Sequence, residues 1–327
     1  MDLASIKPGL LTTRAAMHEV FGGGSQGGII LPKNSPNILI YTDHDSGKKY
    51  GYEDGWLEEE DEFGPIFEYT GQGTRGAQTF LGQRGSRNAA VLYHADAGKS
   101  LRVFMAAGRV AGSKSAAKQQ RYVGEFALDA RLPYTVREAL DEERKPRLII
   151  VFRLRPKGAF ERLTQDVITR ADVTAPQRVS AQIVTTKLVE PKRSKRSESR
   201  RAAQPSLIAE LRQGAVREQY LTELTKRGHD VAAFQIKISG TTTILTTDLY
   251  DATEHELYAI RGASTREEIR MAIGQLKDFA RHIRPRNPKL TTVLPEKPQD
   301  DLVNLLHSEG IDLVLDNTHG YTRYAAE

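Results

Sequence analysis

The chain has 327 residues, 39% of them hydrophobic, and a formal net charge of +5. This length allows two domains that each bury a core, and the hydrophobic fraction is that of a globular protein. The sequence has no cysteine and no long apolar run, which excludes disulfides, thiol catalysis, zinc knuckles and a membrane span.

The start of the chain, residues 1–5, lacks the basic and apolar regions of a signal peptide, so we expect a cytoplasmic protein. The basic surplus favours a polyanionic partner over an acidic one. An acidic block at 58–62 is interpreted as a solvated loop. Six lysines and arginines crowd 192–201, and this stretch fits a phosphate-contacting linker as well as a flexible one.

The first 160 residues alternate short apolar runs with glycine-rich turns. Strands are predicted over 37–41, 101–105, 122–126 and 147–153. This pattern is typical of a curved β-sheet or partial barrel with long loops. A phosphate-binding P-loop is excluded because no glycine-rich stretch ends in Gly-Lys-Ser/Thr.

Residues 161–205 are polar, basic and small, with three prolines, and we interpret them as a basic interdomain linker. The pattern changes to an α/β domain over 206–327. Helical spacing predicts a helix over 206–227 that ends at Gly228. The elements expected after it are strands over 231–238, 243–250 and 256–261, a helix over 265–283, a strand over 289–294, a helix over 299–308 and a strand over 311–315.

The second of these strands ends in a segment, 247–251, that contains the acidic residues Asp248 and Asp251. Metal-dependent phosphodiester cleavage needs carboxylates that hold Mg²⁺ and a lysine-like group beside the scissile phosphate. An acid at one strand end, with an acid and a lysine at i and i+2 of the next strand, would meet that need on one face. Asp251 is interpreted as a turn residue, and an exposed carboxylate before a turn is the alternative for Asp248.

The segments 247–251, 262–267 and 269–276, with 228–231 and 293–298, resemble the PD-(D/E)XK nuclease superfamily. More closely, they resemble bacterial proteins that join such a nuclease to an N-terminal SRA-like domain. The resemblance implies a metal-dependent DNA endonuclease of the type IV restriction kind, with Asp248 as a Mg²⁺ ligand. It also implies a homodimer, because one site cuts one strand.

The family's Glu-x-Lys positions hold Ala259 and Arg261 in this chain. The substitution removes a principal metal ligand, and arginine is a poor proton acceptor. We therefore expect the chain as given to be inactive, through natural loss or an engineered Glu-to-Ala change. Gln275 resembles a Gln-x-x-x-Tyr helix element, with an ordinary helix-face glutamine as the alternative. Arg266 and Arg270 share a helix face, where they would contact DNA phosphate or pair with neighbouring glutamates.

Aromatic residues concentrate between positions 50 and 70, and a domain core is their simplest interpretation. However, the ordered segments 50–55, 67–73, 76–78 and 88–92 resemble the SRA family of 5-methylcytosine-binding domains, a PUA-like fold, over about residues 15–155.

This second resemblance implies that Tyr52 and Tyr69 sandwich a flipped base, that Asp54 accepts from the cytosine amino group, and that Thr70 shapes the space for the 5-substituent. Ala77 stands where the family commonly has aspartate, which affects base preference more than fold. Three further residues are interpreted as DNA backbone contacts, with exposed loop arginines as the alternative: Arg75, Arg84 and Arg87.

The predicted architecture is thus a curved β-barrel, α+β SRA-like domain over 1–160 joined to an α/β PD-(D/E)XK-like domain. The first hypothesis is a modification-dependent restriction endonuclease that flips 5-methyl- or 5-hydroxymethylcytosine and cleaves nearby with Mg²⁺. The alternative is a non-catalytic reader of modified DNA with a vestigial nuclease domain. A third hypothesis keeps the fold but reads an ordinary base or RNA. The first two hypotheses imply double-stranded DNA with modified bases as the partner. They also imply a prokaryotic cytoplasmic protein that is associated with the nucleoid when bound.

Overall fold

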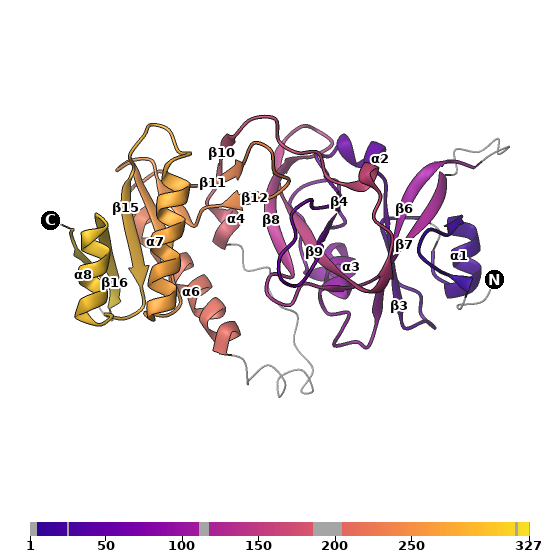
Figure 1. The fold of residues 1–327 in the computed structure, drawn as a ribbon, viewed down its shortest axis with the longest axis horizontal. Coiled ribbons are helices and arrows are strands. Elements are labelled where there is room, and N and C mark those ends of the chain that lie inside the picture. Colours follow the sequence, from indigo (N-terminus) through magenta and orange to yellow (C-terminus); the bar gives the residue numbers. More distant parts are fainter. Residues whose placement is uncertain (1–4, 25, 111–117, 186–204, 318–319, 327) are drawn as a thin grey trace. The chain divides into compact units, whose positions relative to one another are not determined.

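The computed structural model describes residues 5–24, 26–110, 118–185, 205–317 and 320–326, without the side chains of 184–185 and 205–211. The chain divides into two compact units, the first ending at Arg170 and the second beginning at Ala171 (Figure 1). In the part of the chain described, no helix is both long and apolar enough to cross a membrane.

The N-terminal unit is built on one nine-stranded sheet. Its strands run in the order β2-β3-β6-β7-β9-β5-β4, while β1 pairs with β7 and β8 with β9. Within the described residues, β3 and β6 pair in parallel and the other strand pairs of this sheet are antiparallel. The elements are β1 (Leu11–Thr12), α1 (Arg14–Phe21), β2 (Ile29–Ile30), β3 (Asn37–Thr42), α2 (His44–Lys48), β4 (Gly55–Trp56), β5 (Phe67–Thr70), α3 (Gly82–Leu92), β6 (Ser100–Arg109), β7 (Lys118–Leu128), β8 (Tyr134–Leu140), β9 (Pro146–Phe160) and the short 3-10 turn Thr164–Asp166.

The sheet is not closed into a barrel, because no pairing joins β2 at one end of the path to β4 at the other within the described residues. The expected barrel is therefore corrected to an open sheet. Register shifts interrupt the β6–β7 and β7–β9 ladders, for example between Val103 and Phe104. Such bulges bend strands and increase their twist, so the long strands β7 and β9 can wrap around the core without closing it.

Aromatic side chains fill the core of this unit. The ring of Trp56 lies 5.3 Å from that of Phe67 and 5.7 Å from that of Phe126, measured between centroids. All three side chains are fully buried. The simple core interpretation of the 50–70 aromatics therefore holds for Trp56 and Phe67, which cannot contact a ligand.

The C-terminal unit has an eight-stranded sheet in the order β10-β11-β13-β14-β15-β16-β17, with β12 paired to β11. The strands β11, β13 and β14 form an antiparallel meander, and β14, β15 and β16 are parallel. The elements are β10 (Ala175–Ser180), α4 (Gln182–Thr185), α6 (Pro205–Lys226), β11 (Val231–Lys237), β12 (Ile244–Thr246), β13 (Leu249–Asp251), β14 (Glu256–Ile260), α7 (Arg266–Ala280), β15 (Lys289–Leu294), α8 (Asp300–Ser308), β16 (Ile311–Asn317) and β17 (Gly320–Tyr324).

The elements predicted between 206 and 315 occur in the predicted order with one correction, and β17 follows them without having been predicted. The strand expected over 243–250 is two short strands interrupted at 247–248. The predicted linker is wrong in its first half, since β10 pairs with β11 as an edge strand of the second sheet and α4 follows it. The later part of that predicted linker, 186–204, lies outside the described residues.

Helices cover both faces of this sheet (Figure 1). Ile269 and Leu276 of α7 pack with Leu257 and Ala259 of β14, and α8 joins the same cluster. On the other face, Tyr220 of α6 belongs to a second cluster with Tyr258 and Ile260. Alternate residues of β14 thus point to opposite helical layers, as the strand period requires.

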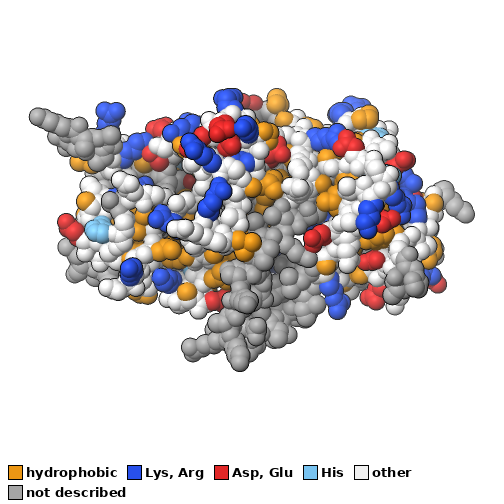
Figure 2. Space-filling model, turned by 180° about the vertical axis from the view of Figure 1, so that it is seen from behind, with side chains coloured by type: hydrophobic (Ala, Val, Ile, Leu, Met, Phe, Trp, Pro, Cys, Tyr) orange, Lys and Arg blue, Asp and Glu red, His pale blue; other side chains and the backbone are white. Residues whose placement is uncertain are grey.

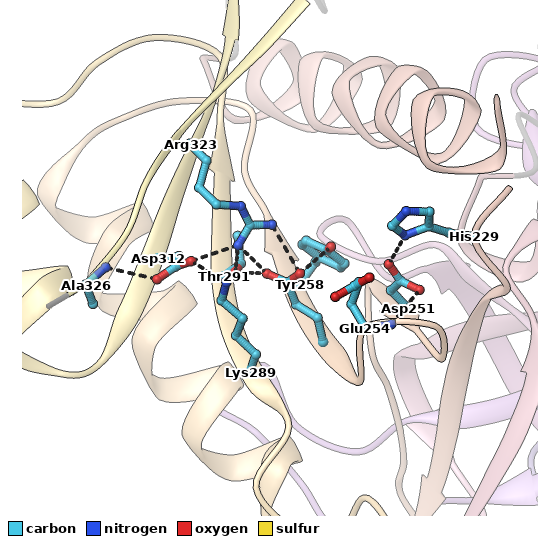
Figure 3. A network of polar contacts seen from close by, with 10 residues as sticks. His229, Asp251, Glu254, Tyr258, Lys289, Thr291, Asp312, Arg323 and Ala326 are labelled. Carbon is cyan, nitrogen blue, oxygen red and sulfur yellow. Dashed lines mark hydrogen bonds and ion pairs between the residues drawn. The ribbon is translucent and has the colours of Figure 1, made fainter. Parts of the chain in front are cut away.

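A buried polar network links four strands of this unit (Figure 3). Glu256 is 2% exposed and accepts hydrogen bonds from Arg323 at 2.7 and 3.1 Å, from the Tyr258 hydroxyl at 2.8 Å and from Thr291. Arg323 also donates to Asp312 at 2.8 Å. One guanidinium therefore compensates two buried carboxylates and attaches the edge strand β17 to the sheet centre.

We expect Glu256→Ala to lower the free energy of unfolding of the C-terminal unit by about 3 kcal/mol or more, because it leaves polar partners buried around a lost carboxylate. Urea unfolding followed by far-ultraviolet circular dichroism measures this. The single tryptophan, Trp56, belongs to the other unit, so its fluorescence transition should stay in place. Glu254→Ala, at an exposed site in the adjacent turn, is the control. Equal effects of the two substitutions would contradict the network's role.

Candidate functional site

A cavity of about 250 Å³ opens in the N-terminal unit. The four residues predicted to form a base pocket, Tyr52, Asp54, Tyr69 and Thr70, all line it. They come from two places in the fold, the segment before β4 and the end of β5, which the β4–β5 pairing brings together. Arg14 of α1 lines the same cavity.

Asp54 is the buried charge of this cavity, with only 8% of its surface exposed. Its carboxylate accepts from the Thr42 hydroxyl at 2.6 Å and from the Thr70 backbone N–H at 2.7 Å. Burial raises the pKa of Asp54, and these two hydrogen bonds act in the opposite direction. A carboxylate offers about four acceptor positions, so Asp54 retains capacity to accept from a ligand amino group.

The two tyrosines are held in place through their surroundings. The Tyr52 hydroxyl donates to the Gly73 carbonyl at 2.5 Å and accepts from Arg147 at 2.9 Å. Tyr69 is 3% exposed, and a Cβ atom at Gly28 would lie 2.5 Å from its hydroxyl oxygen. Burial raises the pKa of both tyrosines, so both rings stay neutral at physiological pH. The cavity therefore has fixed, uncharged aromatic walls.

The loop over 71–79 is organised by buried amides. The side chain of Gln78 accepts from the Ile150 N–H at 2.8 Å and donates to the Gly71 carbonyl at 2.6 Å. Asn88 accepts from the Gln72 N–H at 2.7 Å. Ala77 is exposed, so the loop is ordered without the carboxylate that the SRA family commonly has at this position.

Arg147 was not singled out by sequence reasoning, although it donates to Gly73 and Tyr52 and so joins the loop to the cavity wall. It begins an apolar strand, and nothing in its local sequence indicates a role in a site.

The predicted backbone-contacting arginines of this unit surround the same loop. Arg75 pairs with Glu142 at 2.9 Å and is 75% exposed, and Arg84 donates to the Arg75 carbonyl at 2.7 Å. Arg87 is half-buried and donates to the Gln72 side chain at 3.3 Å. On the one face that Figure 2 shows, lysine and arginine side chains lie in several places with acidic side chains between them.

In the C-terminal unit, three predicted catalytic residues lie together. Arg261 donates to Gln275 and lies 3.4 Å from an Asp248 oxygen. Asp248 also accepts from Arg217 and, at 2.9 Å, from the Ile260 N–H. Arg261 is 3% exposed and lies 3.6 Å from Glu268, so charge is compensated within the cluster.

This donor set does not fit Mg²⁺. Ala259 is buried in an apolar cluster and supplies no ligand. The Asp248 carboxylate pairs with the guanidinium groups of Arg217 and Arg261, which already compensate its negative charge. Glu256 lies on the same face of β14 as Tyr258, opposite to Ala259, and is held there by Arg323, so it cannot replace the missing ligand at position 259. Among the residues that the structure describes, no cluster of three His, Asp or Glu side chains suits a metal ion.

Sequence reasoning missed Arg217, the first partner of Asp248, because it is one charged residue among many on α6. Of the remaining predicted phosphate contacts, Arg266 pairs with Asp301. Arg270 is exposed and, with Gln275, lines a shallow hollow on α7 of about 460 Å³. The structure thus places Arg266 and Arg270 on α7 but in different surroundings.

A family model described as "ScoMcrA-like, SRA domain" matches residues 9–173, a little over half of the 327-residue chain. No curated protein matches. The chain is similar to the solved Type IV phosphorothioation-dependent restriction endonuclease ScoMcrA, with 20% identity and a TM-score of 0.35 over 48% of this chain and 27% of that one. The match therefore spans about a quarter of that protein's length.

Two further solved structures are similar at lower identity. The DNA recognition domain of the cytosine modification-dependent restriction endonuclease LpnPI has 13% identity and a TM-score of 0.32, over 43% of this chain and 66% of that one. MspJI restriction endonuclease in complex with a 27-mer oligonucleotide has 11% identity and a TM-score of 0.26, over 85% of this chain and 73% of that one.

The raised pKa of Asp54 gives a test by pH. A carboxyl whose pKa is raised by folding lowers the free energy of unfolding at any pH at which it is ionised in the unfolded chain. This loss of stability disappears as the pH falls below the pKa of the unfolded chain, where the carboxyl is protonated in both states. We therefore expect Asp54→Asn to unfold at higher urea than the unchanged protein at pH 7, followed by Trp56 fluorescence. The difference should shrink as the pH falls toward 3.8, the ordinary value for this carboxyl.

Asp45→Asn is the matched control, because the Asp45 side chain is 85% exposed. It should leave the urea midpoint unchanged across the same pH range. If Asp54→Asn lowers the midpoint equally at every pH, the buried charge carries no cost and the description of this cavity fails.

Proposed function

The chain belongs to the ScoMcrA-like SRA domain family, and we propose that it binds modified DNA and reads a modified cytosine in the cavity that contains Asp54. The observation that carries this proposal is the convergence of Tyr52, Asp54, Tyr69 and Thr70 on one cavity with a buried acceptor at its wall.

The burial of Asp54 determines how a base can reach it. A carboxylate with 8% of its surface exposed cannot reach a base edge that remains stacked in a duplex. The base has to leave the stack and enter the cavity, which costs a few kcal/mol of unstacking. Stacking between Tyr52 and Tyr69, together with a hydrogen bond from the cytosine amino group to Asp54, offsets that cost.

The base preference follows from the same groups. An ionised carboxylate accepts hydrogen bonds and donates none, so it favours an exocyclic amino group over the carbonyl of thymine or uracil. Thr70 lies beside Asp54 through its backbone N–H and contributes to the wall near the amino group. These groups favour a base with an exocyclic amino group, and on the SRA match we propose a cytosine carrying a 5-substituent, 5-methyl or 5-hydroxymethyl.

The proposed role of the C-terminal unit in this chain is not cleavage. Asp248 is neutralised by Arg217 and Arg261, and the position that would supply a second carboxylate is Ala259. We therefore assign the chain to the non-catalytic readers of modified DNA, with a vestigial nuclease-like domain. Binding needs no Mg²⁺ under this proposal.

Fluorescence anisotropy with duplexes that carry one or no 5-methylcytosine, in EDTA, tests the reading function. We expect the unchanged protein to prefer the modified duplex by about tenfold or more, the range for one additional methyl group held in a close-fitting pocket. Asp54→Asn should abolish this preference while salt-sensitive binding to both duplexes persists. Asp45→Asn should keep it. Equal affinity of the unchanged protein for both duplexes would exclude the proposal.

Cleavage is tested separately with Mg²⁺ and the modified duplex. We expect no strand breaks from the unchanged protein and no heat of Mg²⁺ binding by calorimetry. A chain with both Ala259→Glu and Arg261→Lys should gain Mg²⁺ binding, because it adds a second carboxylate and removes one guanidinium from Asp248. Modification-dependent cleavage by the unchanged protein, lost in Asp248→Asn, would instead identify an active nuclease.

A further inference from the structure

Two arginines meet at one residue beside the cavity. Arg14, at the start of α1, donates to the Gly27 carbonyl at 2.7 Å. A Cβ atom built on Gly27 would lie 2.7 Å from the Nη1 atom of Arg87, on α3. Both guanidinium groups therefore reach Gly27, although they come from helices on separate parts of the chain.

Neither of these arginines forms an ion pair in the part of the chain that the structure describes. Within the described residues, no carboxylate lies at ion-pair distance from Arg14 or Arg87, and their recorded hydrogen bonds go to the neutral oxygens of Gly27 and Gln72. The carboxylate of Asp43, which also lines the cavity, is held by Lys118 at 2.7 Å. Other arginines of this unit differ, for example Arg75, which pairs with Glu142. Asp43 is the acidic residue that acts electrostatically on Arg14, but its carboxylate is already paired with Lys118. Two half-buried guanidinium groups at Gly27 repel each other, and an anion between them would relieve that repulsion.

The surroundings favour a phosphate as that anion. Gly27 and Gly28 have no side chain, and Gly27 is exposed, so the backbone of another molecule can approach closely. The guanidinium of Arg14 lies 4.3 Å from the centroid of the Tyr41 ring, which fixes its orientation. The first turn of α1 has no acidic residue, so the positive end of that helix adds to the same potential. A planar guanidinium group can donate two parallel hydrogen bonds to two oxygens of one phosphate.

We propose that Arg14 and Arg87 form a clamp for the DNA backbone phosphate next to the nucleotide whose base occupies the cavity. This inference rests on the proposed function, since it assigns the phosphate to the flipped nucleotide. Arg14 and Gly28 line the cavity, and Gln72, the acceptor of Arg87, lines it as well. The clamp holds the sugar–phosphate outside while the base lies between Tyr52 and Tyr69.

The experiment removes the phosphate charge and the arginine separately. Duplexes with one 5-methylcytosine carry a single neutral methylphosphonate at the linkage 5′ or 3′ of that nucleotide, and their affinities are measured by anisotropy at constant salt. We expect the unchanged protein to lose about tenfold in affinity at one of the two linkages, as for loss of a hydrogen bond to a charged group. Arg14→Gln should lose a similar factor on the normal duplex and show no further loss on the methylphosphonate duplex.

Arg131→Gln is the control, because Arg131 belongs to the same unit, is exposed, and pairs with Glu62 at 2.7 Å. It should keep the full methylphosphonate penalty. Arg87→Gln repeats the test if Arg14→Gln does not fold, as judged by Trp56 fluorescence. A full penalty in both the Arg14 and Arg87 variants, or no penalty in the unchanged protein at either linkage, overturns the clamp. If the unchanged protein does not prefer 5-methylcytosine at all, the proposed function fails instead.

Discussion

The buried carboxylate of Asp54 is the constraint on which the N-terminal unit depends. Removing an ionised group from water is unfavourable unless hydrogen bonds compensate it, and here β3 supplies the Thr42 hydroxyl while β5 supplies the Thr70 N–H. The close approach of Gly28 to Tyr69 and the amide contacts of Gln78 complete the cavity around that charge. A fold that retains such a group loses stability at neutral pH, and recognition of an amino group is a reason to retain it.

The C-terminal unit, unlike the cavity around Asp54, pairs buried carboxylates with arginines. Its buried acids are compensated inside the protein, Asp248 by Arg217 and Arg261 and Glu256 by Arg323. Asp248 already accepts from Arg217, Arg261 and the Ile260 N–H, and a cation would have to displace one of the two guanidinium groups. The N-terminal unit, by contrast, leaves Arg14 and Arg87 without carboxylate partners beside its cavity. Of the charged groups at these two sites, those available to a ligand therefore lie beside the N-terminal cavity, which supports the assignment of this chain to binding rather than cleavage.

The helices and central strands of the C-terminal unit could be predicted because their apolar residues repeat with a clear period. The edge strands β10 and β17 could not, since an edge strand exposes most of its side chains and β10 contains Pro176. Motif order located the four cavity residues but not Arg14 or Arg217. A single arginine on a helix has no local pattern that distinguishes it from a solvated one, and its role comes from residues that only the folded chain brings near.

The most direct test of this account is whether the modified base leaves the duplex when the protein binds. The fluorescence of 2-aminopurine, placed next to a single 5-methylcytosine, rises when its neighbour unstacks. The account predicts a rise on binding of the unchanged protein in EDTA, and none on the unmodified duplex or with Asp54→Asn. Tight binding to the modified duplex with no change in fluorescence would contradict it.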